Sequence, residues 1–232
     1  MMQIHGLQKT TLLDFPGYVA STVFCGGCNF RCPYCHNRDL VLHSGKVPLI
    51  SEEEIFAHLK KRRDILDGVC ITGGEPTLQP ELERFIRMVK ELGLKVKLDT
   101  NGYKPEVLMD LCKKELIDYV AMDIKGAPEQ YEEITGVKHW DFNKIQESVY
   151  FLMSGDIPYE FRTTVVRELH CEEDLQKVST WISGAKAYYL QNYKDSEQVI
   201  KRGFHGFETE ELKRMCKMVR EKIPAAQIRG VE

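Results

Sequence analysis

The stretch YVASTVFCGGCNFRCPYCHN, residues 18–37, passes from an apolar run directly into four closely spaced cysteines. The run YVASTVFC (18–25) predicts a buried β-strand, because short apolar runs bounded by glycine are typical of core strands. Cys25, Cys28, Cys32 and Cys35 fall within eleven residues and make up half of the eight cysteines in the chain. The sequence therefore predicts a strand whose carboxyl end leads into a cysteine-rich loop.

The rest of the chain repeats the change from an apolar run to an amphipathic segment. We expect strands at residues 18–25, 67–74, 94–102, 118–126, 158–166 and 187–193, and helices at residues 51–66, 80–93, 105–117, 128–135, 141–154, 171–184 and 207–223. Six strands that alternate with helices predict right-handed crossovers and a mostly parallel sheet. The expected fold is α/β, a partial (β/α)6 TIM-like barrel with an open, curved parallel sheet and outer helices, in a single domain over residues 1–232.

The most distinctive residues follow the expected strands. GGEP (73–76) follows the second strand, DTNG (99–102) lies at the end of the third, and DIK (123–125) lies at the end of the fourth. In α/β sheets, ligands bind at the carboxyl ends of the strands. We therefore expect these segments and the cysteines to carry the chemistry.

Composition argues against several classes of protein. The chain has 232 residues, of which 43% are hydrophobic and 29% charged, and its formal net charge is −3. This charge and the lack of a basic tract argue against nucleic-acid binding, and no apolar run is long enough to span a membrane. The N-terminus lacks the features of a signal peptide, so we expect a cytoplasmic, reducing environment in which thiols stay free, bind metal or take part in catalysis.

The residues themselves allow three interpretations of the cysteines. Four thiols interleaved with Gly, Asn, Arg and Pro do not have the pattern of a packed core. A zinc site of two CxxC pairs usually has the pairs further apart, and here only residues 29–31 separate them. Closely spaced thiolates suit an iron–sulfur cluster, held either by Cys25, Cys28 and Cys32 or by Cys28, Cys32 and Cys35.

The second of these triples resembles the signature of the radical S-adenosylmethionine (SAM) superfamily, C-x3-C-x-aromatic-C, with Tyr34 as the aromatic residue. The resemblance implies that Cys28, Cys32 and Cys35 bind three irons of a [4Fe-4S] cluster, and that the fourth iron binds SAM. Cys25 is then not a ligand, and we expect it to have a packing role.

The GGEP segment, which comprises Gly73, Gly74, Glu75 and Pro76, resembles the superfamily's motif for the amino group of SAM. Taken alone it could be a tight turn, because glycine tolerates backbone angles that other residues avoid. Exposed main-chain carbonyl groups and a carboxylate suit an ammonium ion. The cysteine signature and GGEP together are much more specific than either motif alone.

The segments LDTNGY (98–103) and MDIKG (122–126) extend the resemblance to the activases of glycyl radical enzymes. By this resemblance, Lys125 pairs with the carboxylate of SAM, and Asp99 and Asp123 serve its ribose or a bound monovalent cation. Asn101, in the same DTNG turn, is a further residue that we expect at the cofactor.

Two residues of the later strands complete the expected site. Arginine is rarely buried without an anionic partner, so Arg162, inside an expected strand, is a candidate contact for SAM or substrate. Related activases often place a histidine after the sixth strand, where this chain has Gln191 and Asn192. We expect Gln191 at the cofactor in that position.

The resemblance covers most of the chain, roughly residues 1–195. The opening GLQKTTLLDFPGYVASTVF (6–24), followed by CNFRCPYCHN (28–37), looks most like the activating proteins of anaerobic ribonucleoside-triphosphate reductase. This resemblance implies that one electron from a flavodoxin or ferredoxin drives reductive cleavage of SAM. The resulting radical takes a hydrogen atom from a glycine of a partner, here the anaerobic reductase. The cluster and SAM carry the chemistry, so no catalytic side chain is expected.

Other functions remain compatible with the same motifs. The target could be pyruvate formate-lyase or another glycyl radical enzyme, which changes the partner and keeps the chemistry. A small-molecule radical SAM enzyme, such as a 7-carboxy-7-deazaguanine synthase, is a further alternative. A different class altogether is a non-catalytic metal-binding or electron-transfer module.

Overall fold

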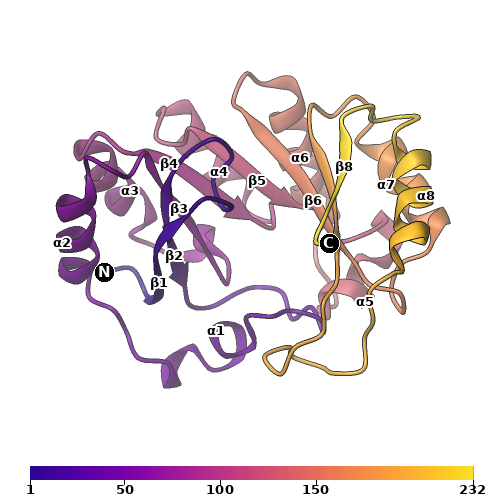
Figure 1. The fold of residues 1–232 in the computed structure, drawn as a ribbon, viewed down its shortest axis with the longest axis horizontal. Coiled ribbons are helices and arrows are strands. Elements are labelled where there is room, and N and C mark those ends of the chain that lie inside the picture. Colours follow the sequence, from indigo (N-terminus) through magenta and orange to yellow (C-terminus); the bar gives the residue numbers. More distant parts are fainter. Residues whose placement is uncertain (232) are drawn as a thin grey trace. The chain divides into compact units, whose positions relative to one another are not determined.

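The computed structural model describes residues 1–231, which form strands and helices in alternation (Figure 1). The chain divides into two compact units, which are described here one at a time. The first unit comprises residues 1–29 and 39–121, and the second comprises residues 30–38 and the chain from residue 122 onward.

The first unit is built on four strands: β1 (Ile4–Thr11), β2 (Ala20–Cys25), β3 (Gly68–Gly73) and β4 (Lys95–Thr100). β1 pairs antiparallel with β2, whereas β2, β3 and β4 are parallel neighbours in chain order. The connections contain α1 (Arg38–Leu42), η1 (Ser44–Lys46), α2 (Glu52–Arg62), η2 (Pro76–Leu78), α3 (Leu82–Glu91) and α4 (Pro105–Lys113). In Figure 1, α2 and α3 flank the strands of this unit.

The second unit contains the parallel strands β6 (Tyr159–Val165), β7 (Tyr188–Asn192) and β8 (Ala226–Arg229). Its helices are η3 (Pro128–Gln130), α5 (Tyr131–Thr135), α6 (Phe142–Ser154), α7 (Glu172–Trp181) and α8 (Thr209–Val219). The remaining strand, β5 (Tyr119–Asp123), runs across the boundary between the two units.

Local sequence explains where the helices begin. The side chain of Ser51 accepts a hydrogen bond from the main-chain N–H of Glu54 and caps α2. Three glutamates in the first turn of α2 and three basic residues in its last turn complement the helix dipole. Pro105 stands in the first turn of α4, where its missing N–H is not needed.

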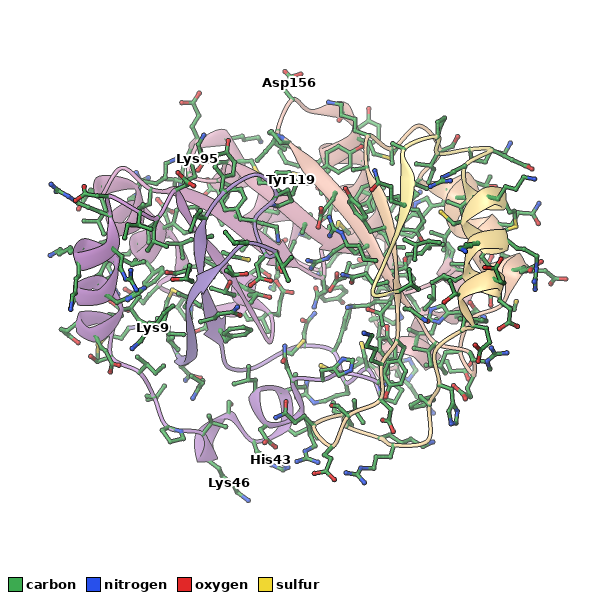
Figure 2. The ribbon with its side chains drawn as sticks, in the orientation of Figure 1. Lys9, His43, Lys46, Lys95, Tyr119 and Asp156 are labelled. Carbon is green, nitrogen blue, oxygen red and sulfur yellow. The ribbon has the colours of Figure 1, made fainter. Side chains whose placement is uncertain are left out.

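Each unit buries its own apolar core between strands and helices. In the first unit the fully buried side chains include Val23, Ile71, Val96, Leu98, Ile55, Leu59, Phe85 and Ile86. In the second unit they include Phe161, Val165, Leu175, Val178, Tyr188, Leu190, Leu212 and Val219. Charged side chains of the connections between strands, such as Lys46 at the end of η1 and Asp156 after α6, extend away from the ribbon (Figure 2). None of the helices within residues 1–231 is long and apolar enough to cross a membrane.

The predicted α/β class is confirmed, and all six expected strands are present as β2 to β7. The count of six strands was too low, because β1 and β8 were missed. In β1, IHGLQKTT, only the two end residues are buried, so the strand has little apolar alternation to recognise. β8 has only four residues and lacks a continuous apolar run. The expectation of a single domain over residues 1–232 stays a prediction.

Candidate functional site

The first part of the cysteine loop continues β2 within the first unit. The N–H of Gly26 donates to the carbonyl of Gln3 at 2.9 Å, and that of Gly27 to the carbonyl of Leu40 at 2.8 Å. Cys25 is fully buried, and burial, assisted by the charge of Glu75, raises the pKa of its thiol well above the usual value. The thiol of Cys25 therefore stays protonated at neutral pH.

The two glycines of GGEP lie directly against this loop. The N–H of Gly74 donates to the carbonyl of Cys25, and the N–H of Glu75 donates to the carbonyl of Gly27, each at 2.8 Å. A Cβ atom on Gly73 would lie 2.3 Å from the nitrogen of Cys25, and one on Gly74 would lie 1.9 Å from the oxygen of Gly27. Gly73 also has a φ of +116°, which other residues rarely adopt. Only glycine lets these two backbone segments approach so closely.

Glu75 is buried and bound entirely within the first unit, with 1% of its surface exposed. Its carboxylate accepts hydrogen bonds from the N–H and hydroxyl of Thr77 at 3.1 and 2.5 Å, from the hydroxyl of Thr100 at 2.8 Å and from the N–H of Asn101 at 2.8 Å. Burial raises its pKa, and these hydrogen bonds counteract the rise only in part. The four bonds use most of the acceptor capacity of a carboxylate and join the GGEP turn to the turn after β4.

Asn101 extends this connection to the cysteine loop. Its Nδ2 donates to Oδ1 of Asn29 at 2.8 Å and lies 3.9 Å from Sγ of Cys28. Its Oδ1 accepts from the N–H of Tyr103 at 3.0 Å. The first cysteine of the predicted signature is thus in contact with the DTNG turn.

Asp99 has a partner that the sequence did not indicate. Lys97, which is 1% exposed, forms an ion pair with Asp99, and its ammonium also lies 3.8 Å from Sγ of Cys70. Buried lysines are rare, and the alternating pattern of LKVKLD gave no reason to expect Lys97 inside. Oδ1 of Asp99 accepts from the Cys70 thiol at 3.7 Å.

The second part of the cysteine loop lies in the second unit. Cys32 and Tyr34 are buried, and Cys35 is half-buried. The N–H groups of Ile200 and Lys201 donate to the carbonyls of Cys35 and Pro33 at 3.1 and 2.7 Å, so the chain after β7 supports the loop. Burial raises the pKa of Cys32 to about 11, although the nearby charge of Lys125 opposes this rise.

A network of charges lies beside Cys32 and Tyr34 in the same unit. Asp123 binds Nζ of Lys125 at 3.1 Å and Nε of Arg162 at 3.0 Å. Glu160, which is 1% exposed, pairs with Arg229 at 2.8 Å and lies 3.9 Å from Arg162. Burial alone would raise the pKa of Asp123, but the two cations lower it to about 2. Burial alone would lower the pKa of Lys125, but the charge of Asp123 raises the pKa of Lys125 well above its usual value.

His170 is a buried residue that the sequence reasoning missed. Its Nδ1 accepts from the N–H of Val166 at 3.1 Å, so its Nε2 carries the proton and donates to the carbonyl of Lys125 at 2.8 Å. This bond fixes the main chain at Lys125. Burial lowers the pKa of His170. No pattern around RELHC marks this histidine, since its role depends on a neighbour 45 residues away.

The remaining candidate, Gln191, lies on β7 beside Arg229 of β8 and is half-buried. Its neighbour Asn192 holds the chain after β7, since its side chain both donates to and accepts from the main chain of Phe207.

The structure thus assembles the sequence-predicted residues in two groups. The first unit brings together Cys28, Gly73, Gly74, Glu75, Pro76 and Asn101 around the loop after β2. The second unit brings together Cys32, Tyr34, Asp123, Lys125 and Arg162. Among the described residues, no group of three His, Cys, Asp or Glu side chains is arranged to hold one metal ion.

Comparison with known proteins identifies the family. The model of the radical SAM superfamily matches residues 22–182. The chain is 34% identical over 200 residues to a protein of Methanocaldococcus jannaschii named as a glycyl-radical enzyme activating enzyme, covering 84% of this chain and 81% of that one. It is 31% identical over 175 residues to the pyruvate formate-lyase 1-activating enzyme of Escherichia coli K12, covering 71% and 68%.

The fold is also similar to that of a solved structure. Streptococcus suis SuiB bound to S-adenosylmethionine superimposes with a TM-score of 0.69 at 17% identity, over 88% of this chain and 48% of SuiB. This likeness confirms the predicted partial TIM-like barrel. The chain belongs to the radical SAM superfamily, and it is an enzyme that catalyses a radical reaction.

Membership assigns the superfamily's cofactors, a [4Fe-4S] cluster and SAM, and the residues present fit them. All eight cysteines lie within residues 1–231 and none of them forms a disulfide, so the sulfur donors that a cluster needs are available. Within the described chain, Nδ2 of Asn29 and the hydroxyl of Tyr34 are buried without a hydrogen-bond partner. Such buried polar groups are rare and suit the acceptor atoms of a bound group.

The contact of Gly74 with Gly27 predicts a strong effect of one methyl group. In Gly74→Ala the new Cβ must displace the backbone of the cysteine loop, which we expect to cost about 1–3 kcal/mol or more. Thermal unfolding should shift down by about 2–12 °C, and reconstituted iron should fall. Gly45→Ala is the matched control, because a Cβ there meets nothing within 4 Å. Equal stability and iron content in the two variants would contradict the proposed role of the glycine.

The environment of His170 predicts a pH dependence. Its folded pKa lies below the value of about 6.5 in an unfolded chain, so below that pH only the unfolded state takes up this proton. The free energy of unfolding should therefore decrease as pH falls from about 6.5 toward 5, and His170 should contribute no pH dependence above 7. Urea unfolding at pH 7.5 and 5.5 should show this loss in the wild type and in the exposed-site control His43→Gln, but less of it in His170→Gln. The same loss in all three proteins would rule out His170 as its source.

Proposed function

We propose that this chain is a radical SAM activase that generates a glycyl radical on a partner enzyme. The observation that carries the proposal is its similarity, over most of its length, to proteins named as activating enzymes of glycyl radical enzymes and of pyruvate formate-lyase. The cysteine signature, GGEP and DIK segments support the same chemistry.

Cys28, Cys32 and Cys35 are the proposed cluster ligands, with Tyr34 beside them. The bound cluster and SAM supply reductive cleavage of SAM and a 5′-deoxyadenosyl radical. Cys25 is not a ligand, and its buried, protonated thiol supports a packing role. The chain itself positions the cofactors and keeps water away from them.

The proposed SAM contacts follow from charge and hydrogen-bonding capacity. GGEP meets the amino group through main-chain carbonyls, because the carboxylate of Glu75 already accepts four hydrogen bonds. Lys125 pairs with the SAM carboxylate, and Arg162 orients Asp123 beside it. The ribose or a monovalent cation is assigned to Asp99 and Asp123. Asn101 and Gln191 complete the proposed set.

The proposed partner is anaerobic ribonucleoside-triphosphate reductase, and the proposed electron donor is a flavodoxin or ferredoxin. The opening segment 6–24 supports this partner by its resemblance to the activators of that reductase. The second candidate is pyruvate formate-lyase, which the names of several relatives favour.

Cysteine substitutions test the proposed ligands. After anaerobic reconstitution, Cys28→Ser, Cys32→Ser and Cys35→Ser should each lose most of the iron–sulfur absorbance and all reductive SAM cleavage, because three thiolates are needed. Cys25→Ser is the matched control from the same loop and should keep both. Loss of the cluster in Cys25→Ser together with its retention in Cys35→Ser would assign the cluster to the other triple.

The partner is tested by electron paramagnetic resonance (EPR). Reduced protein, SAM and the anaerobic reductase of the same organism should give a doublet that collapses when the reductase carries glycine deuterated at Cα. A parallel mixture with pyruvate formate-lyase is the comparison. A radical on the lyase alone would move the assignment to the second candidate. SAM cleavage without a glycyl radical on either enzyme would refute the activase proposal.

A further inference from the structure

We propose that Asn29 and Asn101 form a hydrogen-bond relay that donates N–H groups to the sulfur atoms at the Cys28 corner of the bound cluster and raises the cluster's reduction potential. The proposal rests on the proposed role of Cys28 as a ligand. It gives Asn29, which neither the signature nor the comparisons assign, a specific function.

The orientation of both amides follows from one main-chain donor. The N–H of Tyr103 can bond only to an oxygen, so the atom of Asn101 that it meets at 3.0 Å is Oδ1. The other end of Asn101 is therefore the NH₂ group, which lies 2.8 Å from Asn29. The atom of Asn29 that accepts from this NH₂ group must be an oxygen, so it is Oδ1. The NH₂ group of Asn29 is then directed elsewhere.

This NH₂ group lacks an acceptor in the described chain. Nδ2 of Asn29 is buried and has no hydrogen-bond partner within residues 1–231. A buried donor without an acceptor costs about 1–3 kcal/mol, and such groups are rare in folded proteins. Asn101 holds the amide of Asn29 in place, and the NH₂ group of that amide is buried and unused. We infer that a bound group supplies its acceptor.

The neighbouring thiol makes a sulfur atom of the bound cluster the acceptor that we infer. Cys28 precedes Asn29 in the chain, and its Sγ lies 3.9 Å from both Oδ1 of Asn29 and Nδ2 of Asn101. When Cys28 is a thiolate bound to iron, it can only accept. Asn101 then donates to Sγ of Cys28, and the unused amide hydrogens belong to Asn29, the residue that directly follows this ligand in the chain.

Hydrogen bonds to cluster sulfurs are one of the factors that set the reduction potential. A reduced cluster carries one more negative charge than an oxidised one, so N–H donors stabilise the reduced state more strongly. The relay should therefore make the cluster easier to reduce. Asn101 belongs to the DTNG turn, and its main-chain N–H donates to the carboxylate of Glu75. The GGEP segment therefore helps to position the relay and, through it, influences the reduction potential of the cluster.

The test compares Asn29→Leu, Asn101→Leu and the double variant with the control Asn143→Leu, whose asparagine is exposed on α6. Each is reconstituted, and iron and sulfide are quantified before an EPR-monitored redox titration without SAM. Loss of one such bond should lower the equilibrium constant for reduction about three- to tenfold, a tenfold loss being about 59 mV for one electron. The double variant should shift by less than the sum, because Asn101 holds Asn29. Asn143→Leu should match the wild type.

A second measurement does not depend on whether the variants fold. Wild-type protein labelled with ¹⁵N only at the side-chain amides of asparagine is reduced, because the main-chain N–H of Asn37 also bonds to Cys35. Pulsed EPR should then detect a weak ¹⁵N coupling to the cluster that unlabelled protein lacks. An unshifted potential in Asn29→Leu, or a wild-type cluster without this coupling, would overturn the relay. A wild-type protein that binds no cluster at all would instead refute the proposed ligands, which separates the two failures.

Discussion

The close approach of two backbone segments determines the geometry of the first unit's site. GGEP and the loop after β2 are joined by two main-chain hydrogen bonds of 2.8 Å, at a separation that leaves no room for a Cβ atom. Gln79 reinforces the contact, since its side chain donates to the carbonyl of Gly26 and accepts from the N–H of Gln3. The position of Cys28 and the turn that carries Glu75 therefore cannot vary independently.

Glu75 and Asp123 show how the surroundings of a carboxylate set its pKa. Glu75 is surrounded by neutral donors, and burial raises its pKa. Asp123 is half-buried, but Lys125 and Arg162 lower its pKa to about 2. Neutral hydrogen bonds offset only part of the cost of removing a charge from water, whereas two cations at about 3 Å exceed it. Glu75 is suited to holding a turn together, and Asp123 to remaining ionised.

The parallel α/β fold and the motifs at its strand ends could be predicted from the sequence, because both depend on local patterns. Apolar runs identify the strands, and the spacing of Cys28, Cys32 and Cys35 resembles a known signature. The strand β1 could not be identified in this way, because most of its residues are not buried and it is defined by its pairing with β2. The burial of Lys97 and the contacts of His170 were equally inaccessible, since each depends on a partner in the folded chain.

The charges in the network around Asp123 do not sum to zero. Asp123 and Glu160 contribute two negative charges, while Lys125, Arg162 and Arg229 contribute three positive ones, so these five side chains carry a net charge of +1. With the pKa of Asp123 near 2 and that of Lys125 well above its usual value, this excess persists across the neutral pH range. Excess positive charge attracts an anion more strongly where water is partly excluded than it does in bulk water. The carboxylate of SAM, which we propose as the partner of Lys125, would neutralise this excess.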